Sequence, residues 1–203
     1  MAVDPLELNT TDWRHELPVL SARGLALREP VEADVSALVD LLSLSDATGF
    51  GLTDRATESR VREYVDRTRR DRAAGFAFSY VVTMGSAETV VGLIHVRQLD
   101  PSFEAAEWEM TLTPFVRGTG VFVEATRLVG SFAFNGIGVH RLESRVLLQN
   151  GRANGALRKI GAVQEGVLRR SIRRGGEYLD QVLWAVVRDD WSEQWTTRAP
   201  RVH

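Results

Sequence analysis

Residues 105–136, AAEWEMTLTPFVRGTGVFVEATRLVGSFAFNG, carry the strongest information about the fold. The first part alternates in polarity as a strand does, which places Glu107 and Glu109 on one face and the neighbouring tryptophan and methionine on the other. The strand stops at Pro114, a loop with two glycines follows, and apolar spacing predicts a helix over residues 121–136. A strand, a glycine loop and a helix in this order are typical of a domain that mixes α and β structure.

The segments after this stretch continue the alternation of strands and helices. We expect a strand over residues 141–149, a helix over 150–160, and a closing hairpin whose strands, 164–173 and 178–187, flank the turn 174–177. The helix over 121–136 connects the strand before it to the strand over 141–149, a crossover that must be right-handed if these two strands are parallel.

The segments before this stretch predict a mainly antiparallel start. Residues 20–28 are expected as one strand, 31–45 and 57–74 show helical apolar spacing, and 76–83 and 89–96 are rich in β-branched and aromatic residues. We therefore predict an α/β (α+β) single domain with a mixed, mostly antiparallel twisted sheet flanked by helices.

Composition and charge exclude several classes of function. The 203 residues include 25 basic and 27 acidic side chains, so nothing points to a nucleic-acid partner. The absence of cysteine excludes disulfides, thiolate metal sites and a cysteine nucleophile. No His, Asp or Glu spacing resembles a metal site, and neither a signal peptide nor a membrane span is expected. We therefore expect a cytoplasmic protein with no metal and no membrane partner.

The ends of the chain are expected to differ from its body. We divide the chain into an N-terminal arm over residues 1–18, a domain over 19–190 and a C-terminal tail over 191–203. Three interpretations of Trp13 remain open: a poorly ordered terminus, packing on the domain, or packing on a second subunit. Trp191 and Trp195 are four residues apart, one helical face, and make a homodimer a further possibility.

The loop of residues 117–120 is the first candidate binding site. Glycines allow a close approach of the backbone to a ligand, and the helix start beyond them offers unpaired N–H groups to a diphosphate. Arginine adds a charge that pairs with phosphate. An ordinary turn between a strand and a helix explains the loop equally well. The candidate residues are Arg117, Gly118, Thr119, Gly120, Val121 and Phe122.

The helix that opens at Asn150 is the second candidate site. Asparagine is a good N-cap, which is a structural explanation for Asn150. Asn154 lies one turn further on, where asparagine is a poor helix former, and is harder to explain structurally. Lys159 and Gly161 end the segment.

Together these segments resemble the GNAT superfamily of N-acetyltransferases, in particular its RimJ/RimL-like ribosomal-protein branch. The resemblance runs from about residue 20 to 190. It rests on Ala106-Glu107, the strand end at Pro114, the loop 117–120, the run GVHRLE at 138–143, the helix from Asn150 to Gly161 and the run EYLD at 177–180. It implies a sheet with splayed central parallel strands, and acetyl-CoA as co-substrate.

Two positions depart from the family pattern. Phe122 stands where the loop usually carries a small residue, so a bulky side chain is expected near the diphosphate unless it points away. Ala153 stands where the branch usually carries a serine that is thought to protonate the leaving thiolate, which leaves that role unfilled at this position.

The resemblance implies direct attack of a neutral amine on the thioester. Glu107 or Glu109 would act as the base, and Tyr178 as the acid. Alternatively, the glutamates only pair with an arginine and Tyr178 only packs on its strand. A backbone N–H near Met110 and Leu112 would stabilise the oxyanion, next to a family bulge that splays the strands.

The resemblance also implies positions for the two substrates. The loop 117–122 would hold the diphosphate, and Asn150 and Asn154 would line the pantetheine arm. Lys159 is either near the cofactor or simply solvated. The loop 48–57 is expected to border the acceptor cleft.

Two residues are candidates for the acceptor site itself. Phe50 is either an acceptor contact or part of the core. His95 lies in a strand and is a candidate for facing the acceptor.

The function expected from these observations is acetyl-CoA-dependent transfer of an acetyl group to a primary amine. The acceptor is either a protein or peptide N-terminus or a small-molecule amine. The alternative is a non-catalytic protein that binds or senses acetyl-CoA with the same fold, which the departures at Phe122 and Ala153 favour.

Overall fold

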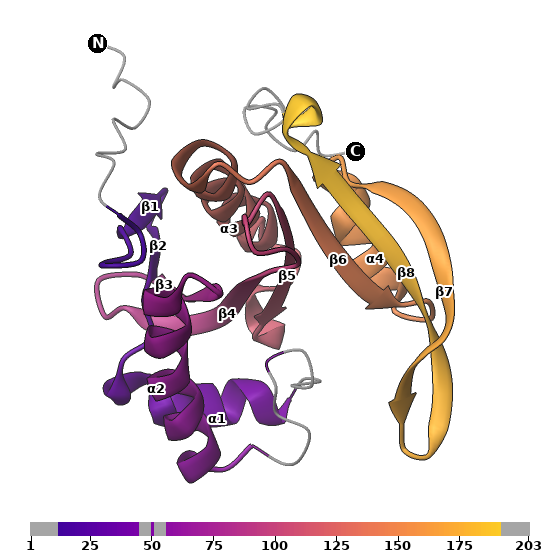
Figure 1. Cartoon of the computed structure of the whole chain (residues 1–203). Coiled ribbons are helices and arrows are strands. Elements are labelled where there is room, and N and C mark those ends of the chain that lie inside the picture. The colour runs from indigo at the N-terminus through magenta and orange to yellow at the C-terminus, as the bar shows by residue number, and fades with distance from the viewer. Residues whose placement is uncertain (1–11, 45–49, 51–55, 192–203) are drawn as a thin grey trace.

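The computed structural model describes residues 12–44, 50 and 56–191, whose strands form one sheet in the order β1-β2-β3-β4-β5-β6-β8-β7 (Figure 1). The strands are β1 Leu20–Ala22, β2 Leu25–Arg28, β3 Ala77–Met84, β4 Thr89–Gln98, β5 Ala105–Leu112, β6 Arg141–Leu147, β7 Val163–Arg174 and β8 Glu177–Val187. The helices are α1 Val35–Ser43, α2 Glu58–Ala74, α3 Val121–Ser131 and α4 Gly151–Lys159.

The sheet is antiparallel except at its centre, where β5 and β6 run parallel. These two strands pair at only three positions, from Ala105 with Arg141 to Glu107 with Glu143. Beyond them β6 pairs with β8 alone, so the strands diverge (Figure 1). The mixed sheet with a splayed parallel pair is thus confirmed, and the splay begins immediately after Glu107.

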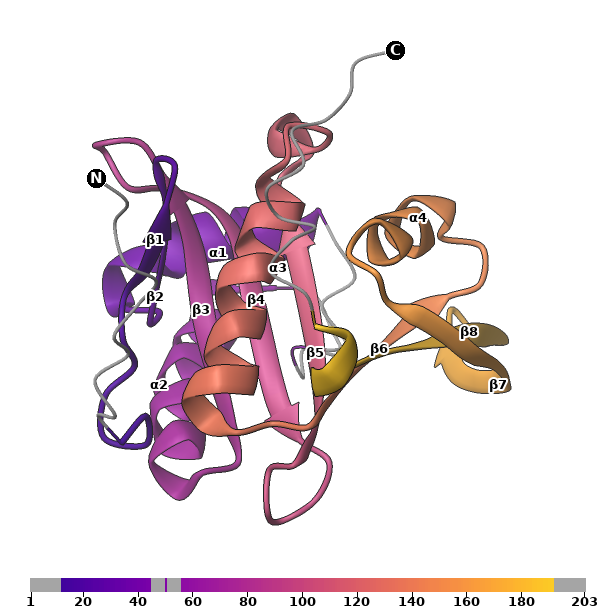
Figure 2. The same cartoon turned by 90° about the horizontal axis from the view of Figure 1, so that it is seen from above.

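Helices cover both faces of the sheet. Figure 2 shows α3 on one face of β3, β4 and β5, with α1 and α2 on the other. The alternation along each strand supplies two cores. Phe78, Trp108 and Trp184 belong to the core beneath α3 and α4, whereas Val81 and Leu93 pack under α1 and α2.

The expected single strand over residues 20–28 is wrong, because it is a hairpin of β1 and β2. Arg23 and Gly24 both have positive φ, 52° and 78°, and Ala22 pairs with Leu25 across them. Two left-handed residues make the two-residue turn whose twist suits a hairpin, and glycine adopts that conformation without strain.

The bulge that the family resemblance implied near Met110 and Leu112 is also absent. The pairing of β4 with β5 is unbroken from Gly92 with Leu112 to Gln98 with Ala106. The splay arises instead because β6 leaves β5 to pair along its length with β8.

The predicted helix over residues 121–136 is present but changes character. α3 ends at Ser131 and continues as a π-helical turn over Phe132–Ile137, which stops at Gly138 with φ of 101°. The turn presents Phe134 to Trp191 with ring centroids 5.1 Å apart.

The aromatic residues near both ends pack on the chain itself. Trp13 is buried against Phe78 and Phe103, with ring centroids 5.7 and 5.3 Å away. Trp191 lies against Gly130 of α3 as well as Phe134, so its ring is engaged within the chain rather than open to a second subunit. Trp195 lies outside the described residues.

Candidate active site

The splay borders a row of polar side chains on the face covered by α1 and α2. Cross-strand pairing aligns Ser79 of β3 with His95 of β4, and His95 with Glu109 of β5. Two residue pairs further along, and so on the same face, Arg97 lies opposite Glu107. Directly paired residues point to the same face, so the register brings these polar groups together.

Glu107 is a buried carboxylate held by two arginines. It accepts a hydrogen bond from Arg97, and Arg145 of β6 lies 3.5 Å from its other oxygen. Arg145 also approaches Glu143 at 3.8 Å. These ion pairs join β4, β5 and β6 across the start of the splay, and they occupy both oxygens of Glu107.

Glu109 is the carboxylate that remains free. Within the described part of the chain it has no hydrogen bond or ion pair, although it is mostly buried. Burial, with the negative charge of Glu107, raises the pKa of Glu109 to about 7, against an opposing effect of Arg97. A carboxylate with that pKa is half ionised near neutral pH and is suited to accept a proton.

His95 is held from behind by a buried chain of hydroxyl groups. Its Nδ1 lies 2.9 Å from Ser79 Oγ, which in turn lies 3.1 Å from the hydroxyl of Tyr64 on α2. Burial, with the charges of Arg67 and Arg97, lowers the pKa of His95 to about 4, so the imidazole is neutral at pH 7.

Ser79 and Tyr64 were not identified as site residues from the sequence. A serine within the apolar run FAFSYVVT was the available signal for Ser79. Tyr64 belongs to the helix that apolar spacing predicts over residues 57–74, and it is fully buried. The contact of its hydroxyl with Ser79 depends on how α2 packs on β3, which the sequence does not show.

The loop before α3 has the features of an anion site. Gly118 and Gly120 have φ of 81° and 91°, which favours glycine at both positions. In the described structure the backbone N–H groups of Gly120, Val121 and Phe122 donate to no protein acceptor, at the positive end of the helix.

The other two loop residues leave the anion site accessible. Arg117 is exposed and its guanidinium lies 3.4 Å from the carbonyl oxygen of Leu112. Thr119 donates to the carbonyl oxygen of Val116 at 2.7 Å, which shapes the loop.

Phe122 points away from this loop. Its ring lies 6.2 Å from the ring of Trp108 and packs against the core beneath α3. Met110 and Leu112 pack against the same core, so only their backbone faces the splay. Phe122, which departs from the family pattern, therefore fills the core and does not crowd the N-terminus of α3.

The two asparagines of α4 have structural partners. Asn150 caps the helix, with its oxygen accepting from the N–H of Ala153 at 3.1 Å. Asn154 is 6% exposed; its amide donates to the carbonyl oxygens of Leu147 and Asn150 at 3.0 and 2.9 Å. Its oxygen accepts from the indole of Trp184 at 2.8 Å. Asn154 therefore ties α4 to β6 and β8 and has no donor left for a ligand.

Three other predicted residues lie apart from Glu109. Tyr178 sits on the part of β8 that extends past its pairing with β6; its ring is 62% exposed and lies beneath the guanidinium of Arg173. Lys159 is exposed in the last turn of α4. The ring of Phe50 is 3% exposed and packs against Tyr64, so it supports the site from behind.

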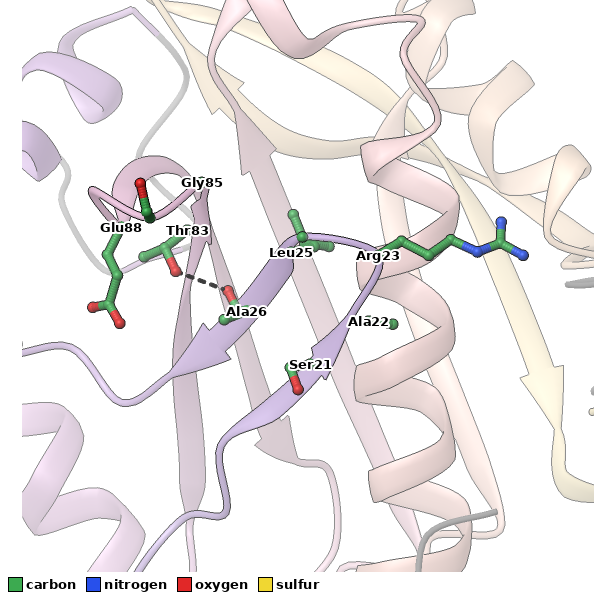
Figure 3. Close-up of a pocket in the computed structure, with 10 residues that line it drawn as sticks. Ser21, Ala22, Arg23, Leu25, Ala26, Thr83, Gly85 and Glu88 are labelled. Atoms are coloured by element: carbon green, nitrogen blue, oxygen red, sulfur yellow. Dashed lines mark hydrogen bonds between the residues drawn. The ribbon is translucent and has the colours of Figure 1, made fainter. Parts of the chain in front are cut away.

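A separate cavity of about 400 Å³ lies at the turn between β1 and β2 (Figure 3). None of the predicted site residues lines it. Thr83 donates to the carbonyl oxygen of Ala26 at 3.3 Å, and Glu88 pairs with Arg28. Its polar groups thus serve the hairpin turns.

Within the described residues no helix is long and apolar enough to cross a membrane, and no three His, Asp or Glu side chains gather as a metal site would require.

The structure combines a sheet that splays at a parallel pair with a glycine loop at the N-terminus of α3, and a free carboxylate lies beside the splay. Residues 24–163 match the family described as the acetyltransferase (GNAT) domain, and the chain belongs to that family. It is an acyltransferase enzyme of the N-acetyltransferase type.

Similar proteins agree with this family. The chain is 26% identical over 139 residues to the probable N-acetyltransferase YjcK of Bacillus subtilis, covering 68% of this chain and 75% of that one. Mycobacterium smegmatis RimJ in complex with CoA-disulfide has the same fold, with a TM-score of 0.71, 19% identity and coverage of 84% and 86%. So does a chimera of the Vibrio cholerae spermidine N-acetyltransferase SpeG with hSSAT, with a TM-score of 0.68, 17% identity and coverage of 87% and 100%.

Proposed function

We propose that this protein transfers acetyl from acetyl-CoA to the α-amine of a peptide or protein N-terminus, with Glu109 as the base. The observation that carries the proposal is the contrast between two glutamates on one strand. Glu107 is neutralised by Arg97 and Arg145, whereas Glu109 is unpaired with a pKa of about 7. Glu109 is therefore the group able to take a proton near neutral pH.

The cofactor site is supported by the backbone at two places. The N–H groups at the start of α3 and the exposed Arg117 suit the diphosphate of CoA. Beyond Glu107 the edge of β5 has no strand beside it, so its backbone can bond an extended pantetheine arm. We propose that Asn150 lies beside the pantetheine arm, whereas Asn154 anchors α4 to the sheet.

The chemistry follows from these positions. Glu109, directly or through one water, accepts a proton from the acceptor's ammonium, and the neutral amine attacks the thioester carbon. A backbone N–H of β5 near Met110 stabilises the oxyanion. The attacking nitrogen then loses its second proton to solvent, the carbon–sulfur bond breaks, and the sulfur leaves as a thiolate.

No hydroxyl stands at position 153 to protonate this thiolate. A thiol has a pKa of roughly 8.5, low enough for departure of the anion without an acid. Tyr178, exposed and distant along the hairpin, is not required.

The charge balance of the site favours a monoamine acceptor. Glu107, Glu143 and Glu165 are matched by Arg97, Arg145 and Arg141, and Arg67 lies beside Tyr64. A polyamine or an aminoglycoside would need a surplus of unpaired carboxylates, and Glu109 is the one unpaired carboxylate in this described group. A single ammonium group, as at a peptide N-terminus, matches that charge.

The test is release of the CoA thiol from acetyl-CoA with a panel of peptides, polyamines and aminoglycosides. The chain has no cysteine, so a thiol reagent detects product alone. We expect release with peptides, abolished in Glu109→Gln and retained in Glu107→Gln. Release only with polycations would contradict the acceptor class. Tight binding of acetyl-CoA without release by any amine would favour the sensing alternative, which rests on Ala153.

We also propose a cytoplasmic location and a homodimer. Trp13 and Trp191 pack within the chain, so a dimer would use another surface. Sedimentation velocity over a range of concentrations would decide the oligomeric state, and fractionation of cells the location.

A further inference from the structure

The direction of hydrogen bonding behind His95 follows from the burial of Tyr64. In the described chain the hydroxyl of Tyr64 has one partner, Ser79, and its side chain is fully buried. If Ser79 were the donor, the phenol hydrogen would be left without an acceptor, at a cost of about 1–3 kcal/mol. Tyr64 therefore donates to Ser79.

The tautomer of His95 follows in turn. A serine hydroxyl has a single hydrogen, and with Tyr64 as donor that hydrogen goes to Nδ1 of His95. Nδ1 therefore accepts, and the proton of the neutral imidazole is on Nε2. Three residues on α2, β3 and β4 thus place an N–H donor at a defined atom.

The Nε2–H group of His95 faces the same space as the carboxylate of Glu109. Nε2 has no protein partner among the described residues, yet it is not among the buried unpaired atoms, and His95 is partly exposed. His95 and Glu109 are a directly opposed cross-strand pair, for which Cβ atoms lie roughly 4.5–5.5 Å apart. A hydrogen-bond donor and a free carboxylate therefore stand side by side.

We propose that His95 is a specificity-determining residue whose Nε2–H binds the first carbonyl oxygen of a peptide acceptor while Glu109 holds its α-amine. In one amino-acid residue the nitrogen and the carbonyl oxygen are separated by three bonds, about 3 Å with standard bond lengths. That separation matches two adjacent side chains on neighbouring strands. A polyamine has no oxygen to meet this donor. The assignment rests on the proposed acetyl transfer and adds the feature of the acceptor that is recognised.

The activity test compares a tripeptide with its alkene isostere, which keeps the shape but lacks the first carbonyl oxygen. We expect the wild-type kcat/KM to be about 10–100-fold higher for the peptide, because the isostere leaves a polar group of the site unpaired. His95→Gln carries an amide nitrogen near the position of Nε2 and should keep much of this preference. His95→Asn reaches only the position of Nδ1 and should lose it. His140→Gln, on an exposed histidine before β6, is the control.

A second readout needs no activity. Side-chain ¹⁵N shifts of His95 should show the Nε2–H tautomer, with Ser79→Ala producing a mixture of tautomers. The charged and titratable groups facing the ring are Glu109 of β5, Arg97 of β4, and Tyr64 and Arg67 of α2. The Nδ1–H tautomer in the wild type would overturn the proposal.

The kinetic outcomes separate the two proposals. Equal rates on peptide and isostere, in an active enzyme, would overturn the role of His95 and leave acetyl transfer intact. Equal losses of preference in His95→Gln and His95→Asn would also overturn it. Thiol release from no amine at all, with acetyl-CoA bound, would instead contradict the proposed function and this assignment with it.

Discussion

At the scale of single residues, the environment separates two identical side chains. Glu107 and Glu109 share a face of β5, two positions apart. Arginines from β4 and β6 pair with Glu107, whereas burial and the negative charge of Glu107 raise the pKa of Glu109 to about 7. A carboxylate paired with arginines and a free one with a raised pKa are suited to different roles in catalysis.

The pH dependence of activity tests this division. The rate of acetyl transfer should rise with pH through an apparent pKa of about 7, because Glu109 must lose its proton to act. Glu107→Gln removes a nearby negative charge, so the rise should move to lower pH with activity kept. Glu109→Gln should lower kcat by roughly 10²–10⁴-fold. Rate profiles from pH 5 to 9 measure both effects. If the rise occurred at the same pH in Glu107→Gln as in the wild type, the charge of Glu107 would not affect the pKa of Glu109.

At the scale of elements, the loop before α3 depends on left-handed glycine. Gly120→Ala places a Cβ in open space, so its cost comes from the positive φ and should be about 1–2 kcal/mol. Any shift of the loop also moves the free N–H groups of α3, so the Kd for CoA should rise about tenfold or more.

The matched control for this substitution is Gly24→Ala. Gly24 has φ of 78° and equally open surroundings, in the turn between β1 and β2. We expect a similar loss of stability with an unchanged Kd, measured by urea unfolding and calorimetry. Equal weakening of CoA binding in both variants would show that the loop is only a turn.

Helix α4 is anchored by one amide. Asn154→Ala would leave the indole N–H of Trp184 without its partner and remove the bond between α4 and the carbonyl oxygen of Leu147, at a cost of about 2–4 kcal/mol in unfolding free energy. Asn150→Ala, which loses only the cap, should cost about 1 kcal/mol. Urea unfolding ranks the two. A stable Asn154→Ala with strongly weakened CoA binding would restore Asn154 to the pantetheine site.

At the scale of the whole molecule, the buried carboxyl group of Glu109 makes the free energy of unfolding decrease as pH rises. The pKa of Glu109 is raised from an ordinary 4.5 to about 7, so between these values the folded chain holds a proton that the unfolded chain has lost. This contribution to the free energy of unfolding is complete below pH 4.5 and is lost as pH rises through 7. His95, whose pKa falls to about 4, acts in the opposite direction: its contribution is lost as pH falls from 6.5 through 4.

Glu109→Gln isolates the first of these effects. We expect the variant to gain roughly 1–3 kcal/mol relative to wild type on going from pH 5 to pH 8, because it has no carboxylate to ionise in the site. Urea unfolding at the two pH values measures this difference. A constant difference between the proteins would mean that the pKa of Glu109 is not raised in the folded state.

Much of the fold was predictable because it rests on local periodicity. The spacing of apolar residues predicted α2, and alternation predicted the faces of β5. The error over residues 20–28 came from a short turn, Arg23-Gly24, that interrupts one apolar run. A glycine after a charged residue was the available signal, and the paired positive φ values are set by the hairpin itself.

The sequence by itself determined the order of the elements, the glycine loop before α3 and the common face of Glu107 and Glu109. It could not choose between those glutamates or place Asn154, Ser79 and Tyr64, since their partners lie on strands and helices remote along the chain. Tertiary structure decided these roles because burial and long-range pairing determine which polar groups are satisfied and which stay free. Periodicity orients a side chain, whereas its pKa and its hydrogen bonds depend on the residues that the fold brings beside it.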